Sequence, residues 1–352
     1  MWGVSLSETN RPWTSSQAAV FGCSGHTVTQ DERSFFEDAN PLGFILFARN
    51  IDTPDQVRNL TSELRDCVGW NAPVLIDQEG GRVQRLRPPH WRSAPPMRQF
   101  GLLFDKDPDR ARAAVRLNMQ TIGAELADLG IDIDCAPVLD VPIPGAHDVI
   151  GDRALSLDST VVGELAEAAC EGLIDVGIVP VIKHLPGHGR AGVDSHAELP
   201  IVDASVADLS EQDFAPFTKI NGLPVAGMTA HVVYEAIDDQ HPATLSPRII
   251  EEVIRNQIGF TGLLFSDDLG MKALSGSFAE KAKQSLAAGC DIALHCSGAL
   301  DEMIQVASGA TTLSETAAAS FNKLESYRGN PRVEIDRTAA AFEVATLLEA
   351  AA

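Results

Sequence analysis

The chain has 352 residues, of which 45% are hydrophobic and 22% are charged, an ordinary balance for a globular protein and a length that one α/β barrel domain can fill. The net charge of -22 disfavours nucleic acid and anionic membrane surfaces as partners, because both are themselves negative. No apolar run is long enough to span a membrane, and residues 1–17 lack the basic start and apolar stretch of a signal peptide. We therefore expect a cytoplasmic protein with no nucleic-acid or membrane partner.

Six cysteines are spread along the chain, and no two of them form a CxxC pair. Several follow apolar residues in predicted strands or helices. This pattern is typical of reduced, mostly buried thiols and not of a disulfide framework, in agreement with a cytosolic protein. The residues are Cys23, Cys67, Cys135, Cys170, Cys290 and Cys296.

Short apolar runs along the chain predict eight β-strands. The run 42–47 is apolar throughout, which indicates a strand covered on both faces, as in a parallel sheet. The eight predicted strands are 18–21, 42–47, 73–76, 131–138, 176–182, 224–229, 262–265 and 291–295.

Helical patterns occupy the intervals between these strands. Thr53 and Pro54 have the residue types of a helix cap and a first helical position. From about residue 107 to 129, apolar residues recur every three or four positions until Gly130 ends the helix. The chain from Val333 onward is rich in alanine and also predicts a helix.

The alternation of eight strands with helices predicts a parallel TIM-type (β/α)8 barrel of the α/β class. In such a barrel the active site lies at the carboxyl ends of the strands. The sequence has no internal repeat and no linker, so we assign residues 18–352 to a single catalytic barrel domain and residues 1–17 to an N-terminal tail.

The segment from Lys183 to His196 carries the densest group of chemically active side chains. It follows the predicted strand 176–182 and holds three histidines, a lysine and an aspartate among residues that force a turn. A single histidine in a loop is most often a solvated residue. Here Asp194 and His196 lie two positions apart, so that in an extended loop the carboxylate can orient the imidazole. We expect this pair to donate a proton near neutral pH.

A second acidic site follows the predicted strand 262–265. Of the adjacent carboxylates Asp267 and Asp268, we expect Asp267 to face the pocket and Asp268 to be solvated or to cap the next helix. With a proton donor on another loop, a carboxylate at this place can act as the nucleophile in glycoside hydrolysis. Retaining enzymes of that kind place their two groups about 5 Å apart.

Further polar side chains follow other predicted strands and suit a sugar, whose ring hydroxyls pair with carboxylates or with the fork of an arginine. A surface ion pair remains the alternative for either arginine taken alone. The predicted binding residues are Asp77, Arg85, Arg153, Lys183 and His184.

The sequence gives little support to a nucleotide, a metal or a cofactor. Gly80 and Gly81 are too short a signal for a phosphate-binding loop. The histidines and the aspartate that a barrel metallohydrolase would use show neither a His-x-His strand motif nor the two-histidine spacing of a zinc protease helix. We therefore predict no metal and no cofactor. The residues considered as ligands are His184, His188, Asp194, His196 and His231.

Four motifs, taken together, closely resemble the family 3 glycoside hydrolases. Within that family they are similar to the bacterial β-N-acetylglucosaminidases (β-hexosaminidases) of peptidoglycan recycling. The resemblance runs from about Ala18 to Cys296, with the motifs in family order and at compatible spacing. The motifs are Asp77 to Arg85, Gly151 to Arg153, Lys183 to Gly189 followed by Asp194 to His196, and Ser266 to Met271.

The resemblance implies a retaining exo-enzyme that removes terminal non-reducing N-acetylglucosamine from peptidoglycan fragments (muropeptides). It implies that Asp267 is the nucleophile of a covalent glycosyl-enzyme and that His196, assisted by Asp194, is the acid/base. The five binding residues named above would hold N-acetylglucosamine in the terminal subsite. Relatives with β-glucosidase activity usually carry a second domain that supplies a carboxylate acid/base, and this chain is too short for that domain.

Several questions stay open at this stage. The chain departs from the family pattern at Leu185, where Phe is common, at Gly270, where Ser is common, and at His295, so the aglycone preference is not fixed. A neutral imidazole repels an incoming anion less than a carboxylate does, which keeps an N-acetylglucosaminide phosphorylase as an alternative. A broader β-glycosidase and a non-catalytic sugar-binding protein are the others. The oligomeric state is also open.

Overall fold

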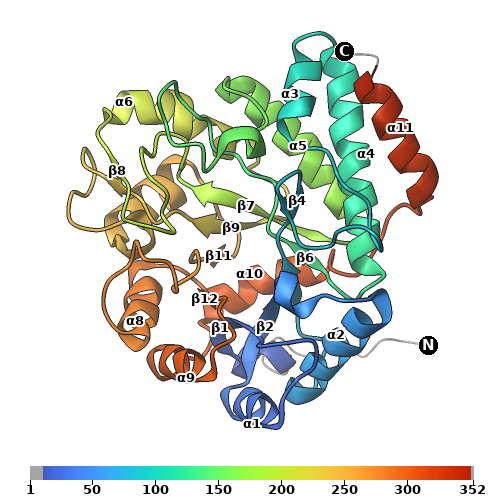
Figure 1. The fold of residues 1–352 in the computed structure, drawn as a ribbon. Helices are drawn as coiled ribbons and strands as arrows, with labels where there is room; N and C mark the ends of the chain where they lie inside the picture. The colour runs from blue at the N-terminus through green and yellow to red at the C-terminus, as the bar shows by residue number, and fades with distance from the viewer. Residues whose placement is uncertain (1–10, 350–352) are drawn as a thin grey trace.

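The structure is a computed structural model that describes residues 11–349. Its described residues form a ring of eight parallel strands surrounded by helices (Figure 1). Neighbouring strands pair along the ring, β1 pairs with β12, and a parallel bridge between Phe265 and Ile292 closes it. The (β/α)8 prediction is confirmed. In chain order the ring contains β1 (Gln17–Gly22), β2 (Pro41–Leu46), β3 (Val74–Ile76), β6 (Ile133–Asp134), β7 (Val179–Leu185), β9 (Ala226–Thr229), β11 (Leu264–Phe265) and β12 (Ala293–His295).

Two of the helices between the strands begin where the sequence signals predicted. Thr53 accepts the N–H of Gln56 with Pro54 at the first position, and Asp107 accepts the N–H of Arg110 at 3.1 Å. Helices surround the ring (Figure 1). They are α1 (Gln30–Ala39), α2 (Pro54–Val68), α3 (Arg98–Phe104), α4 (Pro108–Ala127), α5 (Ser159–Asp175), α6 (Val206–Asp208), α7 (Ala215–Lys219), η7 (Ile249–Gln257), α8 (Phe278–Ala288), α9 (Leu300–Gly309) and α11 (Arg337–Glu349). Of these, α11 packs against α3 and α4.

The predicted tail differs from the structure where it is described. Residues 1–10 lie outside the described residues, but η2 (Pro12–Ser15) and the first residue of β1 fall within the predicted tail. The Trp13 ring centroid lies 5.4 Å from that of Phe321 and 5.9 Å from that of Trp70. Phe321 belongs to α10 (Glu315–Glu325), which packs against the barrel interior and is seen through the ring of strands in Figure 1. Apolar packing therefore fixes the chain before the predicted first strand.

Two strand boundaries also differ from the prediction. The fourth strand, expected at 131–138, pairs only over Ile133–Asp134, with an isolated bridge at Val138, because Pro137 has no N–H to give to a ladder. The fifth strand, expected to end at Ile182, continues to Leu185 and takes three predicted loop residues into the sheet. The chain does break at Pro186, as predicted.

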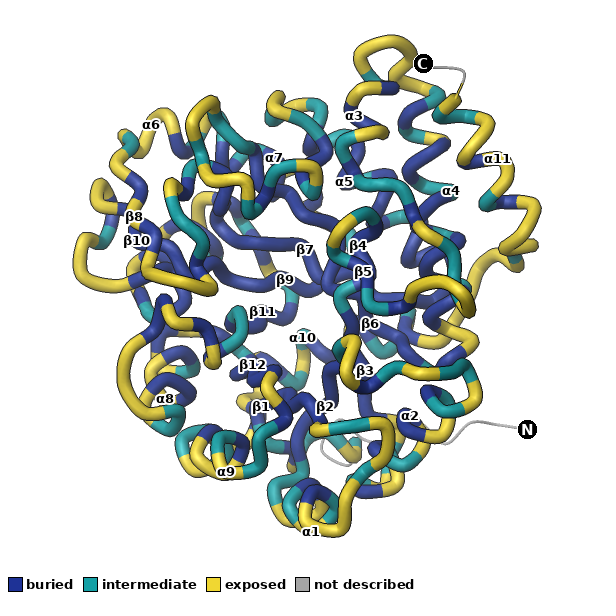
Figure 2. Tube along the Cα trace, in the orientation of Figure 1, coloured by how far each residue is buried: buried dark blue, intermediate teal, exposed yellow. Residues whose placement is uncertain are grey.

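Burial is highest in the ring of strands and falls toward the connecting loops (Figure 2). All six cysteines lie within residues 11–349, and each is buried and free, as expected. In the same residues, no helix combines the length and the apolar character needed to cross a bilayer. The polar side chains described next lie where the strands of this apolar ring end.

Candidate active site

The carboxyl ends of the strands surround a cavity of about 640 Å³. Glu79, His188 and Ser195, which the sequence did not single out as site residues, contribute to its lining. All eight predicted site residues line this one cavity: Asp77, Arg85, Arg153, Lys183, His184, Asp194, His196 and Asp267.

A hairpin directly after β3 holds one wall of the cavity. It pairs β4 (Gln78–Gly80) with β5 (Val83–Gln84) in antiparallel register. Gly80 and Gly81 have φ values of +97° and +55°, which a side chain would strain, so the two glycines allow the chain to reverse. The side-chain oxygen of Gln78 accepts the N–H of Arg85 at 2.8 Å across the hairpin. The glycine pair is therefore a turn that brings Arg85 back beside Asp77.

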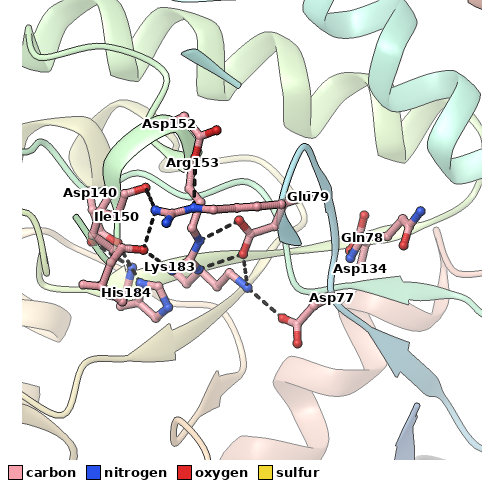
Figure 3. A network of polar contacts seen from close by, with 12 residues as sticks. Asp77, Gln78, Glu79, Asp134, Asp140, Ile150, Asp152, Arg153, Lys183 and His184 are labelled. Atoms are coloured by element: carbon pink, nitrogen blue, oxygen red, sulfur yellow. Dashed lines mark hydrogen bonds and ion pairs between the residues drawn. The ribbon is translucent and has the colours of Figure 1, made fainter. Parts of the chain in front are cut away.

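A network of alternating charges connects this hairpin to β7 (Figure 3). Nζ of Lys183 donates to Oδ1 of Asp77 at 2.8 Å and lies 2.8 Å from Oε1 of Glu79. Arg153 donates through Nε and Nη2 to the two oxygens of Glu79 at 2.9 and 2.8 Å. Arg85 donates to Oδ2 of Asp77 at 2.9 Å. Four of the predicted binding residues thus belong to one ionic cluster with Glu79, and Lys183 at its centre joins the two carboxylates.

The charges of this cluster stabilise one another. Burial alone would raise the pKa of Asp77 and Glu79, but the cations outweigh it, so the pKa of Asp77 is well below its usual range and that of Glu79 is about 2. Burial alone would lower the pKa of Lys183, yet Asp77 and Glu79 raise it above its ordinary value. The cluster is therefore fully charged at neutral pH, and its donors and acceptors suit sugar hydroxyls.

Asp140 holds the fifth predicted binding residue, His184. Its Oδ2 lies 2.7 Å from Nδ1 of His184, and its Oδ1 accepts the backbone N–H groups of His184 and His188 at 3.1 and 2.7 Å. Burial acts to raise the pKa of Asp140, but His184 and these hydrogen bonds lower it to about 2. Since the carboxylate accepts from Nδ1, the other ring nitrogen of His184 is the one left for a ligand.

Sequence reasoning missed both Glu79 and Asp140 as site residues. A signal was present for Glu79, because it lies two positions after Asp77 and side chains at that spacing share a face of an extended chain. Asp140 is an acidic residue just after the apolar run 131–138, at the strand end where barrel sites form. Their partners, however, depend on contacts between distant segments.

Asp134 is a buried carboxyl group of a different kind. Its Oδ1 accepts the N–H of Gln78 at 3.0 Å, while its Oδ2 has no hydrogen-bond partner among the described residues. Burial raises the pKa of Asp134 to about 8, with further contributions from the charges of Asp77 and Glu79. Asp134 is therefore protonated at neutral pH, next to a cluster whose other carboxyl groups are ionised.

Asp267 lies in the loop after β11. The next residue, Asp268, fixes the shape of this loop. Oδ1 of Asp268 accepts the N–H groups of Gly270 and Cys296 at 2.9 and 3.0 Å, whereas the next helix, α8, is capped by Ser277, so Asp268 does not form the helix cap that was expected as one alternative. Oδ1 of Asp267 accepts the N–H of Asp268 at 2.8 Å. Burial acts to raise the pKa of Asp267, but His231, His184 and that hydrogen bond lower it below its ordinary value. Asp267 is thus an ionised carboxylate that lines the cavity.

The pair predicted to donate a proton is formed. Oδ1 of Asp194 accepts both the backbone N–H and Nδ1–H of His196, at 2.9 and 2.8 Å. Nε2 of His196 is then the ring nitrogen free to exchange a proton with a ligand. The His196 side chain is 68% exposed, while the Asp194 side chain is 33% exposed. The imidazole is therefore oriented by its neighbour and open to the cavity.

Two other histidines near the site have structural partners. Nε2 of His231 donates to the carbonyl oxygen of Asp268 at 3.0 Å, and its Nδ1 lies 2.8 Å from the hydroxyl of Thr244. Because both ring nitrogens are engaged, His231 has no free atom for acid/base chemistry. His295, at the end of β12, is fully buried and contacts Glu302 and Ser297 instead of the cavity. It does not form the pocket rim.

The arrangement can bind a polar ring, present a carboxylate to it and supply a proton from a separate loop. In residues 11–349, no three or more His, Cys, Asp or Glu side chains are grouped so that they could hold a metal ion. The acid/base candidate His196 follows β7, and the nucleophile candidate Asp267 follows β11. The two groups therefore come from different strand ends, as a barrel active site requires.

Comparison with known proteins identifies the family of the chain. The profile of the glycosyl hydrolase family 3 N-terminal domain matches residues 15–325. A β-hexosaminidase from Nitrosomonas eutropha is 39% identical over 318 residues, which cover 88% of each chain. The crystal structure of native NagZ from Neisseria gonorrhoeae has a TM-score of 0.85 and 32% identity, covering 95% of this chain and 98% of that one.

Further solved structures are similar over most of this chain. NagZ from the same organism in complex with N-trifluoroacetyl-D-glucosamine has the same TM-score of 0.85 and 32% identity. A family 3 glycosyl hydrolase from Mycobacterium smegmatis has a TM-score of 0.74 and 29% identity, covering 93% of this chain and all of that one. With a family profile that spans most of its length and relatives this similar, the chain belongs to glycosyl hydrolase family 3 and is a glycoside hydrolase.

Proposed function

We propose that the chain is a retaining exo-β-N-acetylglucosaminidase. It removes terminal non-reducing N-acetylglucosamine from peptidoglycan fragments through a covalent glycosyl-enzyme intermediate, in the cytoplasm. The observation that carries this proposal is the placement of an ionised Asp267 and the His196–Asp194 pair around one cavity that also contains the ionic cluster. The relatives named β-hexosaminidase and the NagZ complex with an N-acylglucosamine support the choice of sugar.

Asp267 is proposed as the nucleophile. Its lowered pKa keeps it ionised at neutral pH, and the hydrogen bond from the N–H of Asp268 engages Oδ1. Within the part of the chain that the structure describes, no hydrogen bond engages Oδ2, so that oxygen is available to attack the anomeric carbon. The ester formed then gives way to water, and the product keeps the β configuration.

His196 is proposed as the acid in the first step and the base in the second. As the imidazolium it donates the proton on Nε2 to the departing oxygen, and as the neutral ring it takes a proton from water. Asp194 holds Nδ1–H throughout and balances the charge that the ring carries before it donates. This division of roles needs no second carboxylic acid.

The ionic cluster is proposed to bind the terminal sugar. Asp77 and Glu79 present carboxylate oxygens, and Arg85, Arg153 and Lys183 present N–H groups already fixed by those carboxylates. Because these side chains are already fixed by their ion pairs, they lose little rotamer freedom when a ligand binds. His184, held by Asp140, adds one further polar atom from β7.

The test compares hydrolysis of a chromogenic N-acetyl-β-glucosaminide with that of the matching β-glucoside, with and without added phosphate. The proposal expects hydrolysis of the N-acetylglucosaminide to free N-acetylglucosamine, unaffected by phosphate. Turnover of the glucoside alone contradicts the sugar assignment. Formation of a sugar phosphate instead identifies a phosphorylase, and binding without turnover identifies a sugar-binding protein. Release of N-acetylglucosamine from isolated muropeptides tests the natural substrate.

A further inference from the structure

We propose that Ser195 is a positioning residue that anchors the acid/base loop to the barrel through its hydrogen bond with His188. This inference rests on the proposed function, because it concerns how His196 is held for its reaction. Ser195 neither reacts nor touches the sugar in this account. It acts by fixing its two neighbours in the chain, Asp194 and His196.

Ser195 is the one buried residue of the segment 192–199 in the described structure. Its residue exposure is 3%, although His196 beside it is an exposed side chain. The hydroxyl of Ser195 lies 3.1 Å from Nε2 of His188, and its carbonyl oxygen accepts the N–H of Ala273 at 3.3 Å. The middle of an otherwise solvent-facing loop is therefore attached to the barrel at this residue.

His188, the hydrogen-bond partner of Ser195, is itself fixed in the barrel. Its backbone N–H donates to Oδ1 of Asp140 at 2.7 Å, and its residue exposure is only 3%. The same carboxylate holds the backbone and ring of His184. A continuous set of hydrogen bonds thus runs from the sugar-binding His184 through Asp140 and His188 to Ser195.

The anchor does not depend on protonation of the imidazole. Burial, with a contribution from His184, lowers the pKa of His188 to about 4, so the ring is neutral under ordinary conditions. A neutral ring forms one hydrogen bond with the hydroxyl of Ser195 in either tautomer, because the hydroxyl both donates and accepts. Nδ1 of His188 has no hydrogen-bond partner among the described residues, so there Ser195 supplies the one hydrogen bond of this ring.

The attachment matters because Asp194 and His196 move as a unit. Two hydrogen bonds join Oδ1 of Asp194 to His196, so the pair keeps its internal geometry while its distance from the sugar depends on the loop. Proton transfer requires hydrogen-bond reach to the departing oxygen. A loop without its anchor would occupy that position for less of the time, and reactions that need the proton most would slow most.

The experiment measures kcat/KM of the full chain for an N-acetylglucosamine disaccharide and for the 4-nitrophenyl N-acetyl-β-glucosaminide. For Ser195→Ala we expect the disaccharide value to fall about tenfold, since one hydrogen bond is lost, and the nitrophenyl value to fall less than about threefold. Ser195→Thr, which keeps the hydroxyl, should restore much of the disaccharide activity. Ser285→Ala, a buried serine in α8 whose hydroxyl donates to Ala282, is the matched control and should change neither value.

The double variant Ser195→Ala with His188→Ala separates the anchor from a general loss of packing. If the hydrogen bond carries the effect, the double variant should be no slower on the disaccharide than His188→Ala alone. Equal losses on both substrates, or additive losses in the double variant, would overturn the inference. Circular dichroism of each variant checks that the barrel is folded. If the unmodified protein cleaves neither substrate, the proposed function fails instead, so the two failures are distinguishable.

Discussion

Glu79 and Lys183 form a buried ion pair of 2.8 Å between the hairpin after β3 and the carboxyl end of β7. In the ring, β6 lies between β3 and β7, so the ion pair connects two strands that are not direct neighbours. Arg153 reinforces it from the segment before α5. A polar cluster that lines the cavity thus links two connections of the barrel to the carboxyl end of β7 and prearranges the groups proposed to bind sugar.

Replacing Glu79 tests this coupling. Glu79→Gln leaves Arg153 and Lys183 with less compensation in a buried place, so we expect the free energy of unfolding to fall by about 3 kcal/mol and KM to rise. Urea unfolding followed by circular dichroism measures the stability. The matched control is Glu252→Gln, which removes an exposed pair with Arg248 and should cost at most about 1 kcal/mol. Equal small effects would show that the cluster does not stabilise the barrel.

The raised pKa of Asp134 predicts how the free energy of unfolding depends on pH. An unfolded aspartate ionises near its ordinary pKa, whereas the folded residue keeps its proton to about pH 8, so folding takes up a proton between those values. The native state binds more protons there, and this contribution lowers stability as pH rises. Asp134→Asn is always neutral and should raise Tm increasingly from pH 5 to pH 8, by ~2 °C per kcal/mol recovered. A difference in Tm that stays constant with pH would contradict the raised pKa of Asp134.

Asp194→Ala tests the support of the imidazole. We expect turnover to fall by roughly 10- to 100-fold, less than for loss of Asp267, because Asp194 does not itself react. Removing the carboxylate also removes the charge that favours the imidazolium, so the alkaline limb of the kcat/KM profile should move to lower pH. The measurement is that profile from pH 5 to pH 9. An unmoved limb would mean that Asp194 does not tune His196.

His196→Ala tests the acid/base through the leaving group. An alkoxide of high pKa needs a proton to depart, whereas a nitrophenolate departs readily, so glycosylation should slow far more for a disaccharide. The second step also loses its base, so the intermediate should accumulate and the activated substrate should give a burst. Azide needs no base and should restore turnover by forming a β-glycosyl azide. Equal slowing of both substrates with no azide effect would assign His196 a binding role.

The barrel could be predicted from sequence because each strand is an apolar run and helices such as α2 and α4 begin with a recognisable cap. The same reasoning placed Asp267 and His196 at strand ends, where a barrel collects its functional groups. It could not give Glu79 and Asp140 their roles, because their partners Lys183 and His184 come from a distant strand. The charged residues of one segment do not reveal which other segment will supply the opposite charges.

Some predicted boundaries of strands and of the N-terminal tail were wrong for a related reason. Lys183 and His184 were expected in a loop because they are polar, yet the strand continues through them since their side chains find buried partners at the barrel end. The contact between Trp13 and Phe321 likewise depends on packing that no local pattern reveals. His295, one of the departures from the family pattern, is fully buried and contacts Glu302, a residue of α9.

The central claim is a covalent intermediate on Asp267, and trapping it is the most direct test. The His196→Ala variant is mixed with 4-nitrophenyl N-acetyl-β-glucosaminide, quenched in acid within the burst, and analysed by intact-mass and peptide-mapping mass spectrometry. We predict an added mass of one N-acetylhexosaminyl group on the peptide that contains Asp267, and none when Asp267→Asn is also introduced. An adduct on another residue, or product of inverted configuration with no adduct at all, would contradict the proposed mechanism.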